Sequence, residues 1–422
     1  MNVKAQICAV VTATAMSLTA YAEDKTQSGY EEASALAGPQ SVKAELHDND
    51  KDRESIYAFD TLQTTFKPYF DWKRSLKENH GLSLGLSAHL LFQGAGDTAL
   101  DEDNAASAIY RFQGSWQAVT LSDGSTGTLN WRVENRSGLG LENSPSTLGG
   151  SIAGAQNPGF GYSDNFDTDL SVLNWTQGFA SNKAGIAIGR LAFDAYLDAF
   201  AFQTFSRGFI NRAFILNPTM GTTGIGALGV VGKGYVSDNI WLGAHAYDAN
   251  AASGEFDIDT VNEGEYLTAM EFGWTPSHAR KGTDRIQLSY WHKDARDLAG
   301  TSSGEGFVLS TSWQVAETML PFLRYGNSNG GAGVVATQSL ASGIEVMVQP
   351  DQHFTIGLAW SELNDKSFAS SVDDEWVLET SYKFQLSKNF SLTPDIQFLK
   401  TPANLIDENN TWVAGIRGIL TL

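Results

Sequence analysis

The side chains with the clearest chemical potential gather in one long stretch, residues 193–225. This stretch combines acidic and basic groups with aromatic rings, and the members singled out are Asp194, Asp198, Arg207, Arg212 and Phe205. Opposite charges across a narrow, poorly solvated passage set a preference among ions, and the faces of aromatic rings offer sugars a stacking surface. The alternative is that these rings only anchor the stretch against the rest of the protein.

Further charged residues lie in segments whose side chains alternate between apolar and polar with a period of two, the pattern of a β-strand. In residues 374–386, Trp376 and Leu378 share one face, while Glu379 and Lys383 share the other. If the apolar face meets lipid, the polar face meets water, because an Arg or Lys facing lipid at mid-depth costs about 2–4 kcal/mol. The same parity predicts inward-facing positions for Arg111, Arg132, Glu134, Glu379, Lys383, Asp395, Gln397 and Arg417. These groups either contact a solute or brace the wall.

Motifs that would indicate enzymatic or cofactor chemistry find no supporting context. Residues 224–229 match G-x-G-x-x-G, but no helical pattern follows them. Ser83 sits in a G-x-S-x-G match, yet it lies within continuous alternation rather than at a strand–helix elbow. The seven His residues show no metal-ligand spacing, and acidic pairs such as Asp257 and Asp259 are read as solvated loops, with Ca²⁺ as the alternative. We therefore expect no enzyme activity, no cofactor and no bound metal.

Composition limits the classes of partner. The chain has 422 residues, and its 28 Lys and Arg against 48 Asp and Glu give a formal net charge of −20. Such a chain offers no excess of cations to neutralise phosphates, which argues against nucleic acid as a partner.

The first residues predict export. Residues 1–22 combine Lys4, an apolar stretch and a small-residue cleavage site, as a secretory signal does, and they contain the one cysteine, Cys8. Residues 23–67 are polar and acidic and are predicted to form a mobile arm, and residues 68–80 a short helix. No later stretch offers 18 uncharged apolar residues, so no membrane-spanning helix is expected.

The remaining residues, 81–422, repeat the period-two pattern. Short turn-like links alternate with long polar links, seven of the first kind and eight of the second, which predicts sixteen strands. This is the arrangement of an all-β, 16-stranded antiparallel transmembrane β-barrel with short periplasmic turns, long extracellular loops and a short N-terminal helix. A soluble β-sandwich is the alternative, but it gives no reason for the strict alternation of link lengths. The longest link, 193–225, is expected to fold inward as a constriction of a water-filled channel.

Tryptophans close to the predicted strand ends support a membrane location. They include Trp241, Trp274, Trp313, Trp360 and Trp376. Trp is enriched at both membrane–water interfaces of spanning proteins.

The C-terminal third carries a more specific signature. It comprises Gly-Leu-Ala-Trp-Ser at residues 357–361, Leu-Thr-Pro-Asp-Ile-Gln-Phe at residues 392–398, and a final strand with Val413, Gly415 and Arg417. In these segments the sequence resembles the OprB-type carbohydrate-selective outer-membrane porin family. The resemblance implies a sixteen-stranded barrel in the bacterial outer membrane that lets small sugars diffuse passively into the periplasm.

Three functions remain open at this point. The first is the sugar porin, with outer-membrane lipid and lipopolysaccharide around the barrel and small sugars as the transported solutes. The second is a porin for other small solutes or cations, in line with the acidic composition. The third is a barrel enzyme such as a lipase. The sequence leaves open the preferred solute, the ion selectivity, the choice between monomer and homotrimer, and whether the acidic arm covers the periplasmic mouth.

Overall fold

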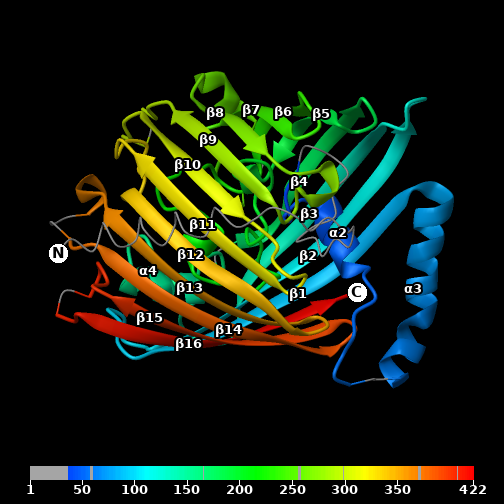
Figure 1. Ribbon diagram of the computed structural model, residues 1–422. Helices are drawn as coiled ribbons and strands as arrows, with labels where there is room; N and C mark the ends of the chain where they lie inside the picture. Colours follow the sequence, from blue (N-terminus) through cyan, green and yellow to red (C-terminus); the bar gives the residue numbers. More distant parts are fainter. Residues whose placement is uncertain are drawn as a thin grey trace.

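The computed structural model describes residues 37–57, 60–164, 166–254, 258–297, 299–368, 372–405 and 407–422. The predicted signal segment, residues 1–22, lies outside these ranges. Within them, sixteen antiparallel strands form one closed barrel, in which every strand pairs with its neighbours in sequence (Figure 1). Pairing of β1 with β16, from Ser87 opposite Thr421 to Ala95 opposite Val413, closes the cylinder. No helix among the described residues is both long and apolar enough to cross a membrane.

The strands cover most of the chain. They are β1 (Leu82–Ala95), β2 (Asn104–Thr120), β3 (Thr126–Gly138), β4 (Phe166–Phe179), β5 (Ala184–Leu191), β6 (Ala227–Tyr235), β7 (Ile240–Asp248), β8 (Tyr266–Trp274), β9 (Arg285–Lys293), β10 (Gly304–Ser312), β11 (Met319–Ser328), β12 (Ala336–Gln349), β13 (Gln352–Leu363), β14 (Glu375–Ser387), β15 (Phe390–Lys400) and β16 (Asn410–Thr421). The predicted number of strands is confirmed. Short and long links alternate as predicted except at residues 275–284, where the link expected to be short is as long as the next one, residues 294–303.

Helices are few and short apart from one. They are α2 (Val42–Asn49), α3 (Asp60–His80), α4 (Pro145–Ile152) and α5 (Arg212–Ile215), with single 3₁₀ turns η1 (Phe193–Ala195), η2 (Asp259–Glu263), η3 (His278–Arg280) and η4 (Asp365–Ser367). Helix α3 lies outside the barrel, beside the end that carries the short links (Figure 1).

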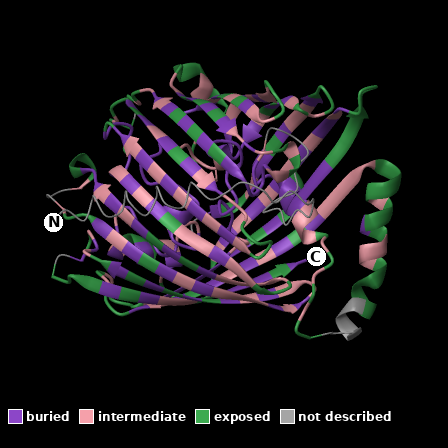
Figure 2. Ribbon diagram, viewed as in Figure 1, coloured by how far each residue is buried: buried purple, intermediate pink, exposed green. Residues whose placement is uncertain are grey.

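Burial alternates along the strands, as Figure 2 shows by its banded ribbons. In β8, Met270 and Phe272 are 69% and 48% exposed, while Glu271 between them is 3% exposed. Apolar side chains on the outside and polar ones on the inside are what a barrel in lipid requires. The closed ladder meets a second requirement, because it leaves no backbone edge unpaired.

One tryptophan departs from the predicted interfacial belt. Trp241 is fully buried and faces the interior, where the ammonium groups of Lys233 and Lys281 lie 5.1 Å and 4.6 Å from its ring centroid. The parity of β7 explains the error, since Trp241 shares the inward face with His245 and Tyr247. Position near a strand end therefore does not by itself give a tryptophan a place at the membrane interface.

The N-terminal region also differs from the expectation. Helix α3 begins at Asp60 rather than Pro68, and Pro68 lies inside it. Part of the expected acidic arm is itself helical: Ser41 caps α2 by accepting from the Ala44 amide at 3.3 Å. Four of the eight residues of α2 are buried, so this part of the arm packs against the barrel.

Two long links fold into the barrel interior. Residues 192–226, here called the inner loop, connect β5 to β6, and residues 139–165 connect β3 to β4. The inner loop contributes a buried aromatic cluster that packs on the wall residue Phe322 and comprises Phe200, Phe202, Phe209 and Phe214. The two links thus fill part of the barrel interior.

Candidate functional site

The first anchor of the inner loop is Asp198, which is fully buried. Its carboxylate forms an ion pair with Arg324 of β11 and accepts from the Ser310 hydroxyl at 3.0 Å. Its backbone amide donates to the Glu271 carboxylate of β8 at 2.7 Å. Burial raises the pKa of Asp198, and Arg324 offsets part of that rise. Asp198 therefore holds the loop to the wall and leaves no free charge in the channel.

The second anchor is Arg207. Its guanidinium donates to the Glu345 carboxylate of β12 from Nε at 3.0 Å and from a terminal nitrogen at 2.6 Å. It also lies over the ring of Phe202, 5.2 Å from the centroid. Burial opposes the charge of Arg207, but Glu345 outweighs that effect, and the pKa of Arg207 is raised. The pair is a geometrically strong, two-bond contact.

The third anchor joins the wall residues Glu379 and Arg417 to the loop backbone. Glu379 of β14 accepts from the amides of Ile210 at 2.6 Å and Asn211 at 3.1 Å. Arg417 of β16 donates to the carbonyls of Arg207, Gly208 and Phe209, the last at 3.2 Å. Both wall residues had been predicted to face inward, and here they fasten a loop.

The remaining predicted wall residues of β15 connect the two folded-in links. Gln397 donates to the Pro158 carbonyl and to Asp395, each at 2.9 Å, and accepts from the Asn211 side chain at 2.9 Å. Lys383 of β14 is one of the cations that face Asp48 of α2. Although burial favours the neutral acid, Arg53, Lys51 and Lys383 lower the pKa of Asp48 to about 2.

Arg212 and Asp194 differ from the two anchored charges of the inner loop. Within the described part of the chain neither of them enters an ion pair. The Nε of Arg212 is buried without a hydrogen bond, and its guanidinium lies 5.7 Å from the Phe160 ring centroid. Burial lowers the pKa of Arg212 to about 10 and raises that of Asp194, with Arg132 and Arg111 opposing the rise. These two groups are the inner-loop charges that no ion pair neutralises in the described part of the chain.

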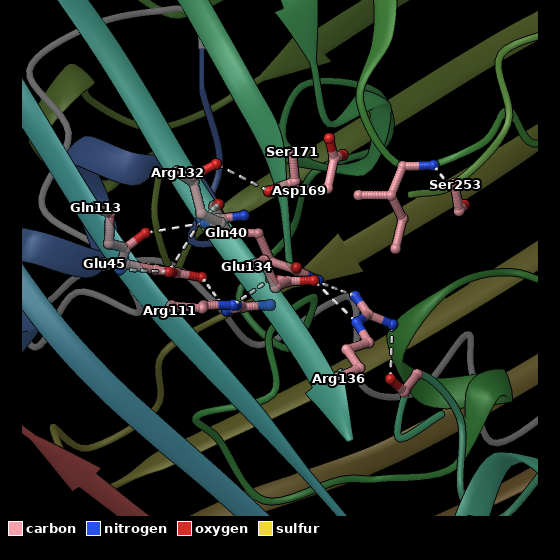
Figure 3. A network of polar contacts seen from close by, with 12 residues as sticks. Gln40, Glu45, Arg111, Gln113, Arg132, Glu134, Arg136, Asp169, Ser171 and Ser253 are labelled. Atoms are coloured by element: carbon pink, nitrogen blue, oxygen red, sulfur yellow. Dashed lines mark hydrogen bonds and ion pairs between the residues drawn. The ribbon is translucent and has the colours of Figure 1, made fainter. Parts of the chain in front are cut away.

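A cluster on β2 and β3 carries the other predicted wall charges (Figure 3). Arg111 donates to Glu134 at 2.6 Å, and Arg136 pairs with the same carboxylate at 2.8 Å. Arg132 donates to the side chain of Gln113 at 2.9 Å. The predicted loop residue Phe205 lies beneath Arg111, whose guanidinium is 5.7 Å from the ring centroid.

Several partners of these groups were not predicted. Strand parity places three of them on the inner face, so the alternation pattern could have predicted their direction; they are Glu271, Arg324 and Glu345. Glu375 at the start of β14 accepts from the amides of Gly154, Ala155 and Gln156 at 2.7 to 3.1 Å and holds the 139–165 link. The inward position of Glu45 in α2 could not be predicted from alternation, because its segment is not a strand.

Comparison with known proteins agrees with this architecture. Residues 347–422 match the family described as "Carbohydrate-selective porin, OprB family". The structure is similar to that of Pseudomonas putida OprB, with a TM-score of 0.67 and 15% identity over 84% of this chain and 97% of that one. The chain is a porin homologue with an OprB-type C-terminal region. Its fold is that of the outer-membrane porin barrels.

Two further relatives extend the comparison. Porin AaxA of Chlamydia abortus is 24% identical over 320 residues, which is 72% of this porin homologue and 67% of the relative. A mutant of the Rh. blastica porin has a TM-score of 0.51 at 11% identity and covers 81% of this chain and 100% of that one. At such identities the solved structures bear on the fold alone.

Proposed function

We propose that this porin homologue lets small carbohydrates diffuse passively and selectively across the outer membrane. The observation that carries the proposal is the inner loop inside the barrel. It presents two charges that make no ion pair, Arg212 and Asp194. The Arg212 guanidinium lies 5.7 Å from the ring centroid of Phe160, which in turn packs against Phe205. The carbohydrate-selective porin family that matches residues 347–422 supports sugars as the solute class.

The proposed mechanism is exchange of hydration for transient contacts. Hydroxyl groups of a sugar hydrogen-bond to Arg212 and Asp194, while its apolar face stacks on an aromatic ring. The site must bind weakly, because conduction requires that a solute also leaves. A dissociation constant on the order of 1 mM corresponds to only about −4 kcal/mol and suits that requirement.

The orientation of the barrel and its surroundings follow from the same proposal. The inner loop is the constriction, the short links face the periplasm, and the apolar outer band contacts outer-membrane lipid and lipopolysaccharide. Residues 1–22 serve as the export signal. A porin for other small solutes or cations is the second candidate, favoured by the net charge of −20.

Planar-bilayer conductance with sugar titration tests the proposal. Reversible block of the ion current by monosaccharides at millimolar concentration is the expected result. Current that is cation-selective and indifferent to sugars would support the second candidate instead. Absence of any current from correctly inserted protein would overturn both.

The variants Arg212→Ala and Arg212→Lys sharpen that test. Both lose the planar guanidinium that can donate two parallel hydrogen bonds, but only Arg212→Ala loses the charge. Weaker sugar block in both variants is expected, with altered ion preference only in Arg212→Ala. Unchanged sugar block in both would remove Arg212 from the solute path.

A further inference from the structure

Residues 37–57, here called the lumen segment, run through the barrel rather than beside it. At one end the Gly38 amide donates to the Ala195 carbonyl of the inner loop at 2.7 Å. At the other end the amides of Ile56 and Tyr57 donate to carbonyls of β14, those of Gln385 and Leu386, at 2.9 and 3.0 Å. The segment therefore links the inner loop to the barrel end that carries the short links.

Helix α2 in the middle of the lumen segment packs on β1, β2 and β3. A Cβ on Gly85 of β1 would lie 2.6 Å from Leu46 Cδ2, so the absence of a side chain there makes room for the helix. Val42 and Leu46 belong to the same buried cluster as Tyr196 of the inner loop. The helix is thus wedged between the wall and the loop (Figure 1).

Two buried ion pairs from one carboxylate attach α2 to β2 and β3. Glu45 is 8% exposed and forms ion pairs with Arg111 at 2.9 Å and Arg132 at 3.0 Å. It also accepts from the Gln113 amide at 2.9 Å, and Arg132 donates in turn to the Gln40 carbonyl at 2.8 Å (Figure 3). Buried charge pairs fix geometry strongly, because either partner left alone would be buried without compensation.

The attachment at the barrel end is of a different kind. The Glu54 amide donates to the Asp351 carboxylate of the β12–β13 link at 2.8 Å, and Asp52 pairs with Lys388 of the β14–β15 link. Both contacts are solvent-exposed, where an ion pair contributes little. The buried ion pairs of Glu45 and the apolar contacts of α2 therefore hold the segment more strongly than these two exposed contacts do.

Little space remains beside α2. Between the helix and β3 and β4 lies a cavity of about 40 Å³, lined by amide and hydroxyl side chains that include Thr128, Asn130, Asn174 and Thr176. A cavity of this size holds a few water molecules and excludes a sugar ring. Movement of α2 would join this polar surface to the channel.

We infer that the lumen segment is a second, displaceable constriction of the channel, and that Glu45 is the residue that retains it. The inference rests on the proposed channel function. With α2 in place, passage is confined to the side of the barrel away from β3 and β4. With α2 displaced, the channel widens and Arg111 and Arg132 lose one of their two neighbouring carboxylates.

Glu45→Ala tests this inference in single-channel recordings of the full-length protein. We expect at least a doubling of the conductance and a shift of ion preference toward anions. The matched control is Glu54→Ala, which removes the same charge from an exposed position of the same segment and should leave both properties unchanged. Equal conductance in Glu45→Ala, Glu54→Ala and the parent would overturn the inference.

A reversible lock separates displacement of the segment from a folding defect. Leu46→Cys and Gly85→Cys are added to Glu45→Ala, so that a disulfide can hold α2 on β1. We expect low conductance in the oxidised protein and high conductance after reduction. Equal conductance in both states, or failure of the disulfide to form, would contradict the inference. If the parent conducts without sugar block, the sugar proposal fails while the ratio of oxidised to reduced conductance still tests the lumen segment.

Discussion

Two parts of the inner wall hold their contents in different ways. On β8 to β14, wall residues bind the inner loop through hydrogen bonds and ion pairs; they include Glu271, Arg324, Glu345 and Glu379. The inner loop is also joined covalently to β5 at one end and to β6 at the other. On β2 and β3, Arg111 and Arg132 are bonded to one carboxylate, Glu45, of a segment that enters from outside the barrel. The partner of an inward-facing charge therefore decides its role: it can hold the inner loop, hold the lumen segment or contact a solute. Strand parity alone does not distinguish these roles.

The largest effect is expected where a loop anchor is broken from the wall side. Arg324→Met leaves the buried Asp198 carboxylate without its ion pair, which costs about 3–5 kcal/mol of stability. Urea unfolding of the purified barrel in detergent measures the loss. The double variant Arg324→Met with Asp198→Asn removes the uncompensated charge and should recover a large part of it. Equal stability of the single variant and the parent would show that Asp198 does not depend on Arg324.

A smaller loss of stability is expected at the second anchor. Arg207→Ala breaks the bonds to Glu345, but the Nδ1 of His353 still lies 3.4 Å from that carboxylate and keeps a polar partner beside it. We expect a cost of about 1–3 kcal/mol, below that of Arg324→Met, with noisier single-channel current because the loop is released. Arg212→Ala, which breaks no ion pair, is the control and should lose less than Arg207→Ala in the same unfolding experiment. The reverse order would contradict the division into anchored and free charges.

The aromatic partner of Arg212 gives a smaller, purely functional effect. Phe160→Ala removes the ring that lies 5.7 Å from the guanidinium, and with it a cation–π contact and a stacking surface. We expect sugar block to weaken about threefold to tenfold, which corresponds to about 0.7–1.4 kcal/mol. Phe179→Ala, at an exposed position of β4, is the control. Equal block in both variants and the parent would mean that Phe160 does not contact the solute.

The smallest effect concerns pH. Because burial raises the pKa of Asp194 above its usual 3.8, the carboxylate gains its proton at a higher pH than exposed aspartates do. As the pH falls, ion preference should therefore move toward anions before surface acids titrate, and Asp194→Asn should abolish that step. The effect on folding stability has the opposite sign to that of a carboxylate in an ordinary salt bridge. The contribution of Asp194 to stability is fully present below its pKa in the unfolded chain and is lost as the pH rises through its higher pKa in the folded protein. Asp194→Asn is thus expected to be slightly more stable at neutral pH, as urea unfolding would show.

The barrel was predictable because its signals are local. A period of two along each strand and the alternation of link lengths give the strand number, and parity places residues such as Glu379, Arg417 and Glu134 on the inner face. The same reasoning missed the direction of Trp241, which needed the parity of its own strand rather than its distance from the strand end.

The partners inside the barrel could not be read from such signals. Glu45 and Arg111 are separated by 66 positions, and Arg207 and Glu345 by 138, so that only the closed fold brings them together. The helix α2 is short and strongly polar, and its placement comes from one buried carboxylate and a glycine on β1. The division of the inner-loop charges into anchored and unpaired groups likewise depends on contacts across the barrel.

The most direct test of the account is the zero-current potential of Arg212→Ala and Asp194→Asn under the same salt gradient. If the two unpaired charges of the inner loop face the ion path, Arg212→Ala shifts the potential toward cation preference and Asp194→Asn shifts it toward anion preference. Shifts of the same sign, or potentials equal to that of the parent in both variants, would contradict the claim that these two groups set the selectivity of the channel.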